Sequence, residues 1–144
     1  THGLQIQLLG EFCLTYNGGR IAAFIRRACE ASLERLQTDY IDLYQFHLGR
    51  YDLSRAVEVR DTLEALVADG KIRAYGWSTD DPERARLFAA GPLCTAIQHR
   101  LNIFEGSADT LAVCEQNNLA SSNREPLEQG LLTGKFCAHS QLPA

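Results

Sequence analysis

The stretch from Ile25 to His47 constrains the fold more than any other part of the chain. In its first half, apolar and small side chains recur every three to four residues, the period of a helix with one buried face. Gln37-Thr38-Asp39 ends that period, and Tyr40 to Phe46 is a short aromatic and branched run that suits a buried strand. A helix that feeds a buried strand is half of a βαβ unit, and ligands gather at the carboxyl ends of such strands. His47 therefore lies where a functional side chain is expected.

Composition and charge narrow the class of protein. The 144 residues carry a formal charge of -4 and 45% hydrophobic side chains, an ordinary balance for a domain with a core. The mild acidity gives no attraction for nucleic acid or membrane, no apolar run approaches the roughly 20 residues that span a bilayer, and no signal peptide is visible. The cysteines have no metal-ligand spacing, and Cys29 and Cys114 fall on apolar helix faces, which favours buried thiols in a reducing compartment. We expect a cytoplasmic protein without a metal site.

Strand and helix patterns alternate along most of the chain. Ser54 is expected to cap a helix whose apolar side includes Val57, and Gly70 to end that helix with a left-handed residue. Such alternation predicts a parallel sheet with crossover helices. The expected strands are 5–9, 40–46, 71–78, 95–98 and 119–122, and the expected helices are 21–36, 55–68, one from Pro82 to Gly91, and one from Ser107 or Asp109 to about Gln116.

The number of βα units limits the architecture. Four to five units fit in this length, whereas a closed (β/α)₈ barrel takes roughly 250 residues. We therefore expect an α/β fold consisting of a partial (β/α)₈ TIM barrel, with residues 1–144 as a single domain. A smaller sandwich-like α/β domain is the alternative. A partial barrel leaves strand edges open, which predicts self-association through those edges.

Four stretches of the chain match one family in order and spacing. They are 31–47, 66–78, Ile97-Gln98, and Pro126-Leu127 followed by 130–135. In these stretches the chain resembles the aldo-keto reductase superfamily, nearest to the branch that includes bacterial general-stress and potassium-channel β-subunit-like members. The resemblance implies a (β/α)₈ barrel that binds NADPH at the carboxyl ends of its strands. It also implies reduction of a small aldehyde or ketone by hydride transfer.

The same resemblance assigns roles to individual residues. His47 matches the active-site histidine that follows the family's fourth strand. Ser78 and Gln98 match residues that hold the nicotinamide carboxamide, and Thr79 stands beside Ser78 where the family usually has asparagine. Arg124 falls where the family places a residue, often aromatic, that stacks on the nicotinamide. The loop that wraps the pyrophosphate in the family is matched by Leu127, Gly130, Leu131 and Thr133.

Three catalytic positions of the family have no match in this chain. The family's proton donor is a tyrosine, with an aspartate before it, on an early segment that the chain does not contain. The catalytic lysine has no counterpart in Thr1-His2-Gly3, which resembles its surroundings. Tyr16 is the only tyrosine upstream, and its place beside a turn favours an ordinary surface residue. We therefore expect a truncated reductase that binds its cofactor weakly and does not turn over.

Structural roles compete with several of these assignments. Taken alone, a histidine such as His47 at the end of an apolar strand is more often structural. Ser78 is suited to capping the helix that follows it, whereas Gln98 fits a cap less well. The glycines of 130–134 are also typical of a plain turn. Two further expectations are an ion pair between Asp42 and Arg73, and a helix-dipole role for Asp80-Asp81.

Two alternatives to a reductase stay open at this point. The first is a non-catalytic nucleotide-binding or assembly module that keeps a cofactor surface. The second is a degenerate reading frame without function. The identity of the carbonyl substrate and the choice between NADPH and NADH are not readable, because specificity in such folds lies on loops.

Overall fold

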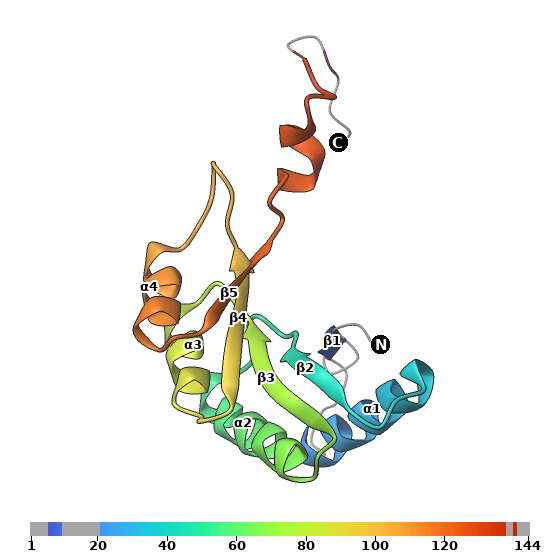
Figure 1. Cartoon of the computed structure of the whole chain (residues 1–144). Helices are drawn as coiled ribbons and strands as arrows, with labels where there is room; N and C mark the ends of the chain where they lie inside the picture. Colours follow the sequence, from blue (N-terminus) through green and yellow to red (C-terminus); the bar gives the residue numbers. More distant parts are fainter. Residues whose placement is uncertain (1–5, 10–20, 138–139, 141–144) are drawn as a thin grey trace.

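The computed structural model describes residues 6–9, 21–137 and 140. These residues form one five-stranded sheet in the order β1-β2-β3-β4-β5, and every neighbouring pair of strands is parallel. The helices alternate with the strands and line one side of the curved sheet (Figure 1). The elements are β1 Ile6–Leu9, α1 Ile21–Leu36, β2 Ile41–Phe46, α2 Leu53–Ala68, β3 Ile72–Ser78, α3 Pro82–Ala89, β4 Cys94–Arg100, α4 Ala108–Gln116, β5 Ala120–Arg124 and a 3₁₀ helix Glu128–Thr133.

The arrangement confirms the predicted α/β fold with parallel strands and the architecture of a partial barrel. Helix α1 has the expected bounds, and the first three strands lie within one residue of the expected ends. The last two strands differ more, because β4 extends from Cys94 to Arg100 and β5 runs from Ala120 to Arg124. Tyr16 and the Thr1-His2-Gly3 stretch lie outside the described residues. No helix in the described ranges has the length and apolarity needed to cross a membrane.

The start of α2 differs from the prediction. Asp52, not Ser54, is its N-cap, and the Asp52 carboxylate accepts hydrogen bonds from the Ser54 backbone N–H at 3.0 Å and hydroxyl at 2.9 Å. Val57 is 42% exposed, because the buried stripe of the helix follows Ala56, Val59, Leu63 and Leu66 instead. The end of α2 is as expected, with Gly70 at φ +72°.

The core lies between the sheet and its helices. An aromatic cluster joins β2, β3 and α3, with the ring centroids of Trp77 and Phe88 4.6 Å apart and those of Phe46 and Trp77 5.3 Å apart. Aromatic pairs at these separations add to the stabilisation from apolar burial. Cys29 and Cys114 are buried in the same core, which confirms the prediction for these two thiols.

The opposite face of the sheet is concave and lined by small and polar side chains. Side chains alternate along a strand, so the strand register places Gln45, Gly76, Ala96 and Ala120 in one row on this face. A Cβ atom at Gly76 would lie 2.3 Å from the carbonyl oxygen of Ala96, so β3 approaches β4 too closely there for any side chain. The carboxyl ends of the five parallel strands lie along one edge of this face.

Candidate functional site

A polar pair occupies the carboxyl ends of β3 and β4. The register aligns Ser78 with Gln98 and Gln98 with Ser122, so the three residues form one row across β3, β4 and β5. The buried Ser78 hydroxyl donates a hydrogen bond to Oε1 of Gln98 over 2.9 Å. Ser78 does not cap the following helix, because Asp81 accepts the backbone N–H groups of Glu83 and Arg84 at 2.8 and 3.3 Å. The alternative role as a helix cap is therefore wrong for Ser78.

Thr79 connects the Ser78–Gln98 pair to the loop after β2 through hydrogen bonds. Its buried hydroxyl donates to the carbonyl of Gly49 over 3.2 Å and accepts the backbone N–H of Asp81 over 3.2 Å. Its own N–H donates to the carbonyl of Gln98 over 2.8 Å. The Thr79 side chain is thus engaged by backbone groups, and it links the loops after β2 and β3 directly beside Ser78.

His47 comes immediately after β2, the strand next to β3 in the sheet. It lies two residues beyond Gln45, whose place in the register is on the concave face. The side chain is half-buried, and no ion pair or hydrogen bond joins its ring to another described residue. A half-buried imidazole at a strand end can donate a hydrogen bond to a bound oxygen atom.

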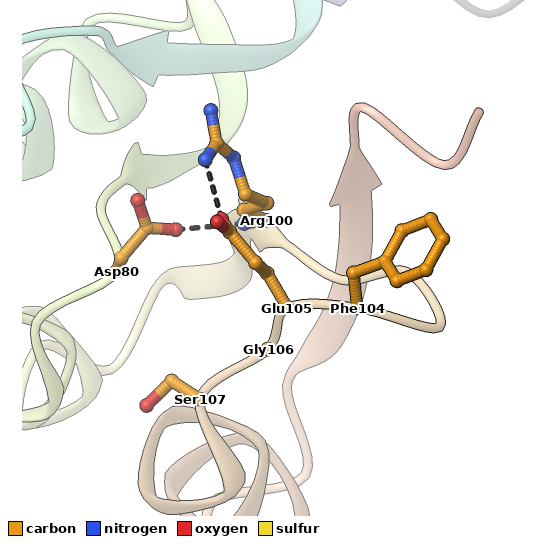
Figure 2. Close-up of a pocket in the computed structure, with 6 residues that line it drawn as sticks. All are labelled: Asp80, Arg100, Phe104, Glu105, Gly106 and Ser107. Carbon is orange, nitrogen blue, oxygen red and sulfur yellow. Dashed lines mark hydrogen bonds and ion pairs between the residues drawn. The ribbon is translucent and has the colours of Figure 1, made fainter. Parts of the chain in front are cut away.

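Asp80 joins the ends of three strands. One of its carboxylate oxygens accepts the backbone N–H of Arg100, at the end of β4, over 2.7 Å (Figure 2). The other oxygen forms an ion pair with the guanidinium of Arg124, at the end of β5. Asp81 is the N-cap of α3 and Asp80 directly precedes it, so both aspartates stand at the amino end of the helix, where the expected helix-dipole role places them. The contacts of Asp80 with Arg100 and Arg124 come in addition to that role.

The surroundings of Asp80 keep its carboxyl group ionised. Partial burial acts to raise its pKa, but the hydrogen bond from the Arg100 amide and the ion pair with Arg124 together outweigh that effect and hold the pKa below its usual value. A cavity of about 900 Å³ opens beside it. The cavity is lined by Gly49, Arg50, Asp80, Asp81, Arg84, Arg100 and Arg124.

The segment after β5 projects away from the sheet (Figure 1). Asn102, in the β4–α4 loop, holds it by donating to the carbonyl of Glu125 over 3.2 Å and to the Glu128 carboxylate. The N–H of Gly130 already donates to the carbonyl of Leu127 over 3.0 Å. Leu127 and Leu131 expose 54% and 44% of their surface. The structure therefore does not bring the expected pyrophosphate residues of this loop, including Thr133, against Ser78 and His47.

Several residues of the site are not found by reasoning from the sequence. Arg100 forms ion pairs with Glu105 and Glu125, both at 2.5 Å, and Arg84 pairs with Asp81. Arginines scattered over three elements give no spacing signal. Arg100 comes level with Arg124 only because β4 extends to Arg100, which the structure shows and the sequence pattern does not. The predicted pair of Asp42 with Arg73 is confirmed at 2.8 Å.

The geometry defines a class of protein. Residues with amide, hydroxyl, imidazole and guanidinium side chains stand at or near the carboxyl ends of the parallel strands β2 to β5, the edge where α/β enzymes bind ligands. None of the described groups clusters as a metal site would require. The chain thus carries part of an α/β ligand site built from hydrogen-bonding side chains.

Residues 15–142 match the Aldo/keto reductase family. The chain belongs to this family of oxidoreductases. It is 41% identical over 140 residues to the aldo-keto reductase YhdN of Bacillus subtilis, covering 92% of this chain and 42% of that protein. It is 34% identical over 114 residues to the NADH-specific methylglyoxal reductase of Escherichia coli, covering 76% of this chain and 35% of that protein.

The fold is shared with solved structures of the family. The aldo/keto reductase from Klebsiella pneumoniae in complex with NADP and acetate superposes with a TM-score of 0.72 and 32% identity, covering 95% of this chain and 48% of that one. The chain spans between 33% and 42% of the length of the curated relatives it matches. These relatives therefore contain further chain beyond the part that aligns with this one.

Proposed function

We propose that this chain forms the part of an NADPH-dependent aldo/keto reductase that holds the nicotinamide end of the cofactor, in an enzyme that reduces a small aldehyde or ketone. The hydrogen bond between Ser78 and Gln98 carries the proposal, because it fixes a donor and an acceptor side by side at the ends of β3 and β4. Family membership supports it, since the family binds a nicotinamide cofactor.

The residues present fit the nicotinamide group. A carboxamide needs one acceptor and one donor, and the side chain of Gln98 offers both, while the Ser78 hydroxyl offers either. Arg124 stands at the end of the next strand, where its planar guanidinium can lie against an aromatic ring. We therefore assign Ser78, Gln98 and Arg124 to the nicotinamide, Thr79 to the support of Ser78, and the Leu127, Gly130, Leu131 and Thr133 loop to the phosphates.

The bound cofactor would supply the hydride that reduces the carbonyl. We assign His47 the task of orienting that carbonyl by a hydrogen bond from its neutral ring. Of the four described tyrosines, Tyr44 and Tyr75 are buried in the core, and Tyr40 and Tyr51 are half-buried. Burial first, and then the hydrogen bond to Glu64, raises the pKa of Tyr75, which makes it a poorer proton donor. We infer that this chain by itself binds the cofactor without completing the reduction.

The test is titration of the purified chain with NADPH and NADH, followed by fluorescence, with cofactor oxidation measured against a panel of aldehydes. NADH is included because the Escherichia coli relative is named NADH-specific. Gln98→Ala is expected to weaken binding about tenfold or less, the cost of one or two hydrogen bonds. Gln116→Ala, which removes an exposed glutamine at the end of α4 and likewise changes no charge, is the matched control and should bind as the wild type does.

The outcomes separate the alternatives. Binding that is weakened in Gln98→Ala but kept in the control supports the proposed site. Binding without turnover also fits a non-catalytic nucleotide-binding module. A folded chain that binds neither cofactor at millimolar concentration would rule out the assignment of Ser78 and Gln98.

A further inference from the structure

Arg124 is held by one carboxylate. Among the described residues, Asp80 is the only acidic side chain within ion-pair distance of the Arg124 guanidinium. The two residues are 44 positions apart in the chain, Asp80 just after β3 and Arg124 at the end of β5, with β4 between these two strands. This ion pair fixes the orientation of the guanidinium and balances its positive charge.

Asp80 is itself fixed from two other sides. Its second carboxylate oxygen accepts the Arg100 backbone N–H, and its backbone carbonyl accepts the hydroxyl of Thr110 over 3.0 Å. Thr110 is buried at the start of α4. Figure 2 shows Asp80 directed at the base of Arg100, where β4 ends. Asp80 is thus held at one carboxylate oxygen by β4 and at its backbone carbonyl by α4, so it orients the Arg124 guanidinium rather than the reverse.

Three of the four arginines that line the cavity form ion pairs with acidic side chains, and the fourth, Arg50, has no ion pair among the described residues. Arg84 pairs with Asp81, and Arg100 pairs with Glu105 and Glu125. The Arg124–Asp80 pair belongs to the same wall and has a formal charge of zero. Removing either partner therefore changes the local charge by one unit in a known direction.

This charge matters for a nicotinamide ring because the ring is neutral in the reduced cofactor and positively charged in the oxidised cofactor. An unbalanced guanidinium against the ring would repel the oxidised form and leave the reduced form nearly unaffected. A carboxylate behind the guanidinium cancels that repulsion.

We propose that Asp80 is a positioning residue that sets the relative affinity of the site for oxidised and reduced cofactor, by orienting Arg124 and cancelling its charge. This inference rests on the proposed function, in which Arg124 lies against the nicotinamide. It adds a residue that contacts no reacting atom and acts through its ion pair.

The experiment compares the dissociation constants for NADP⁺ and NADPH in four versions of the chain. Asp80→Asn keeps an acceptor for the Arg100 N–H but leaves one positive charge, so NADP⁺ should bind about five- to tenfold more weakly relative to NADPH. Arg124→Gln leaves one negative charge and should shift the ratio in the opposite direction. The double variant is neutral again, and its ratio should return to within about twofold of the wild type.

Asp109→Asn is the control for total charge and should leave the ratio unchanged. If the two single variants shift the ratio in the same direction, or weaken both forms equally, Asp80 has a purely structural role and the inference is wrong. Should Asp80→Asn fail to fold, the sign of the Arg124→Gln shift decides the question. A wild-type chain that binds neither form overturns the proposed function itself, which is a distinct result.

Discussion

At the scale of single residues, burial decides which thiols of this protein can react. Burial raises the pKa of Cys94 to about 12 and that of Cys29 to about 11, because a thiolate is poorly solvated in the core. Cys137 is exposed beyond the 3₁₀ helix. The thiolate is the reactive form, so the raised pKa and the burial of Cys29 and Cys94 both slow their reaction relative to that of Cys137.

We therefore expect iodoacetamide at pH 8 to modify Cys137 at least about a hundredfold faster than Cys29 or Cys94 in the folded chain. Peptide mass spectrometry after timed quenching measures each site separately. In urea the rates should converge, because the difference arises from folding. Equal rates in the native chain would contradict the buried placement of both thiols.

Single residues also show where reasoning from the sequence succeeds and fails. Ser78 and Gln98 were predicted to end neighbouring strands, and their contact follows because parallel strands end at the same edge. The contacts of Asp80 with Arg100 and Arg124 were not predicted, because the sequence shows only that two aspartates precede Pro82. The partners of Asp80 come from β4 and β5, and such distant pairings leave no local signal.

At the scale of elements, the contact between β3 and β4 depends on Gly76. Gly76→Ala would place a methyl group 2.3 Å from the Ala96 carbonyl oxygen, which is backbone and cannot rotate away. The strands must separate, at a cost of about 1–3 kcal/mol in the free energy of unfolding.

Urea denaturation followed by circular dichroism measures this loss. The control is Gly49→Ala, whose Cβ would meet the Ser78 carbonyl at an ordinary 3.4 Å and should change stability by less than about 0.5 kcal/mol. Similar stability of the two variants would show that β3 and β4 do not approach as closely as described.

The ion pair of Asp80 with Arg124 joins the segment after β3 to the end of β5, and its contribution to stability depends on pH. The folded-state pKa of Asp80 lies below its usual value, despite burial acting to raise it, because the Arg100 amide and Arg124 stabilise the carboxylate. A lowered pKa adds stability that is present above the unfolded-state pKa of about 4 and is lost as the pH falls through the folded-state value.

The difference in unfolding free energy between wild type and Asp80→Asn should therefore be greatest above pH 5 and shrink below about pH 4. It should stay under about 1 kcal/mol, since the pair is partly exposed to solvent. Urea titrations at pH 3, 4, 5 and 7 test this. A difference that grows on acidification would show that Asp80 is not stabilised as a carboxylate.

Elements with a long periodic pattern were predicted best. The 16 residues of α1 were placed without error, because four turns of one buried stripe leave little choice of bounds. Strands β4 and β5 are short, and their ends depend on pairing with each other, which a single segment does not encode. The 3₁₀ helix was missed because its course requires positive φ at Gln129 and Gly130 within a turn-like sequence.

At the scale of the whole molecule, the two outermost strands of the described sheet have backbone N–H and C=O groups that no neighbouring strand pairs. β1 and β5 each pair with one strand only. Unpaired strand edges are templates for association with another chain. We expect the purified chain to self-associate through the β5 edge, so that its apparent mass rises with concentration.

Analytical ultracentrifugation between about 5 and 200 μM checks this expectation. Asn123→Lys places a charge at an exposed position of β5 and should weaken association, since lysine on an edge strand opposes pairing. The matched control is Ala68→Lys, which adds the same charge at the exposed end of α2, a helix that packs on the central strand β3. A monomer across the whole range would refute the prediction.

The order of the sheet has a consequence for how the protein is made. Strands β1 to β5 stand side by side in the order of their synthesis, so each strand finds its partner in the unit that left the ribosome just before it. At roughly 5–20 residues per second, a βα unit of about 30 residues emerges every few seconds, which is long compared with local folding. The sheet can thus form one strand at a time on the nascent chain, and in each intermediate the strand added last has an unpaired edge.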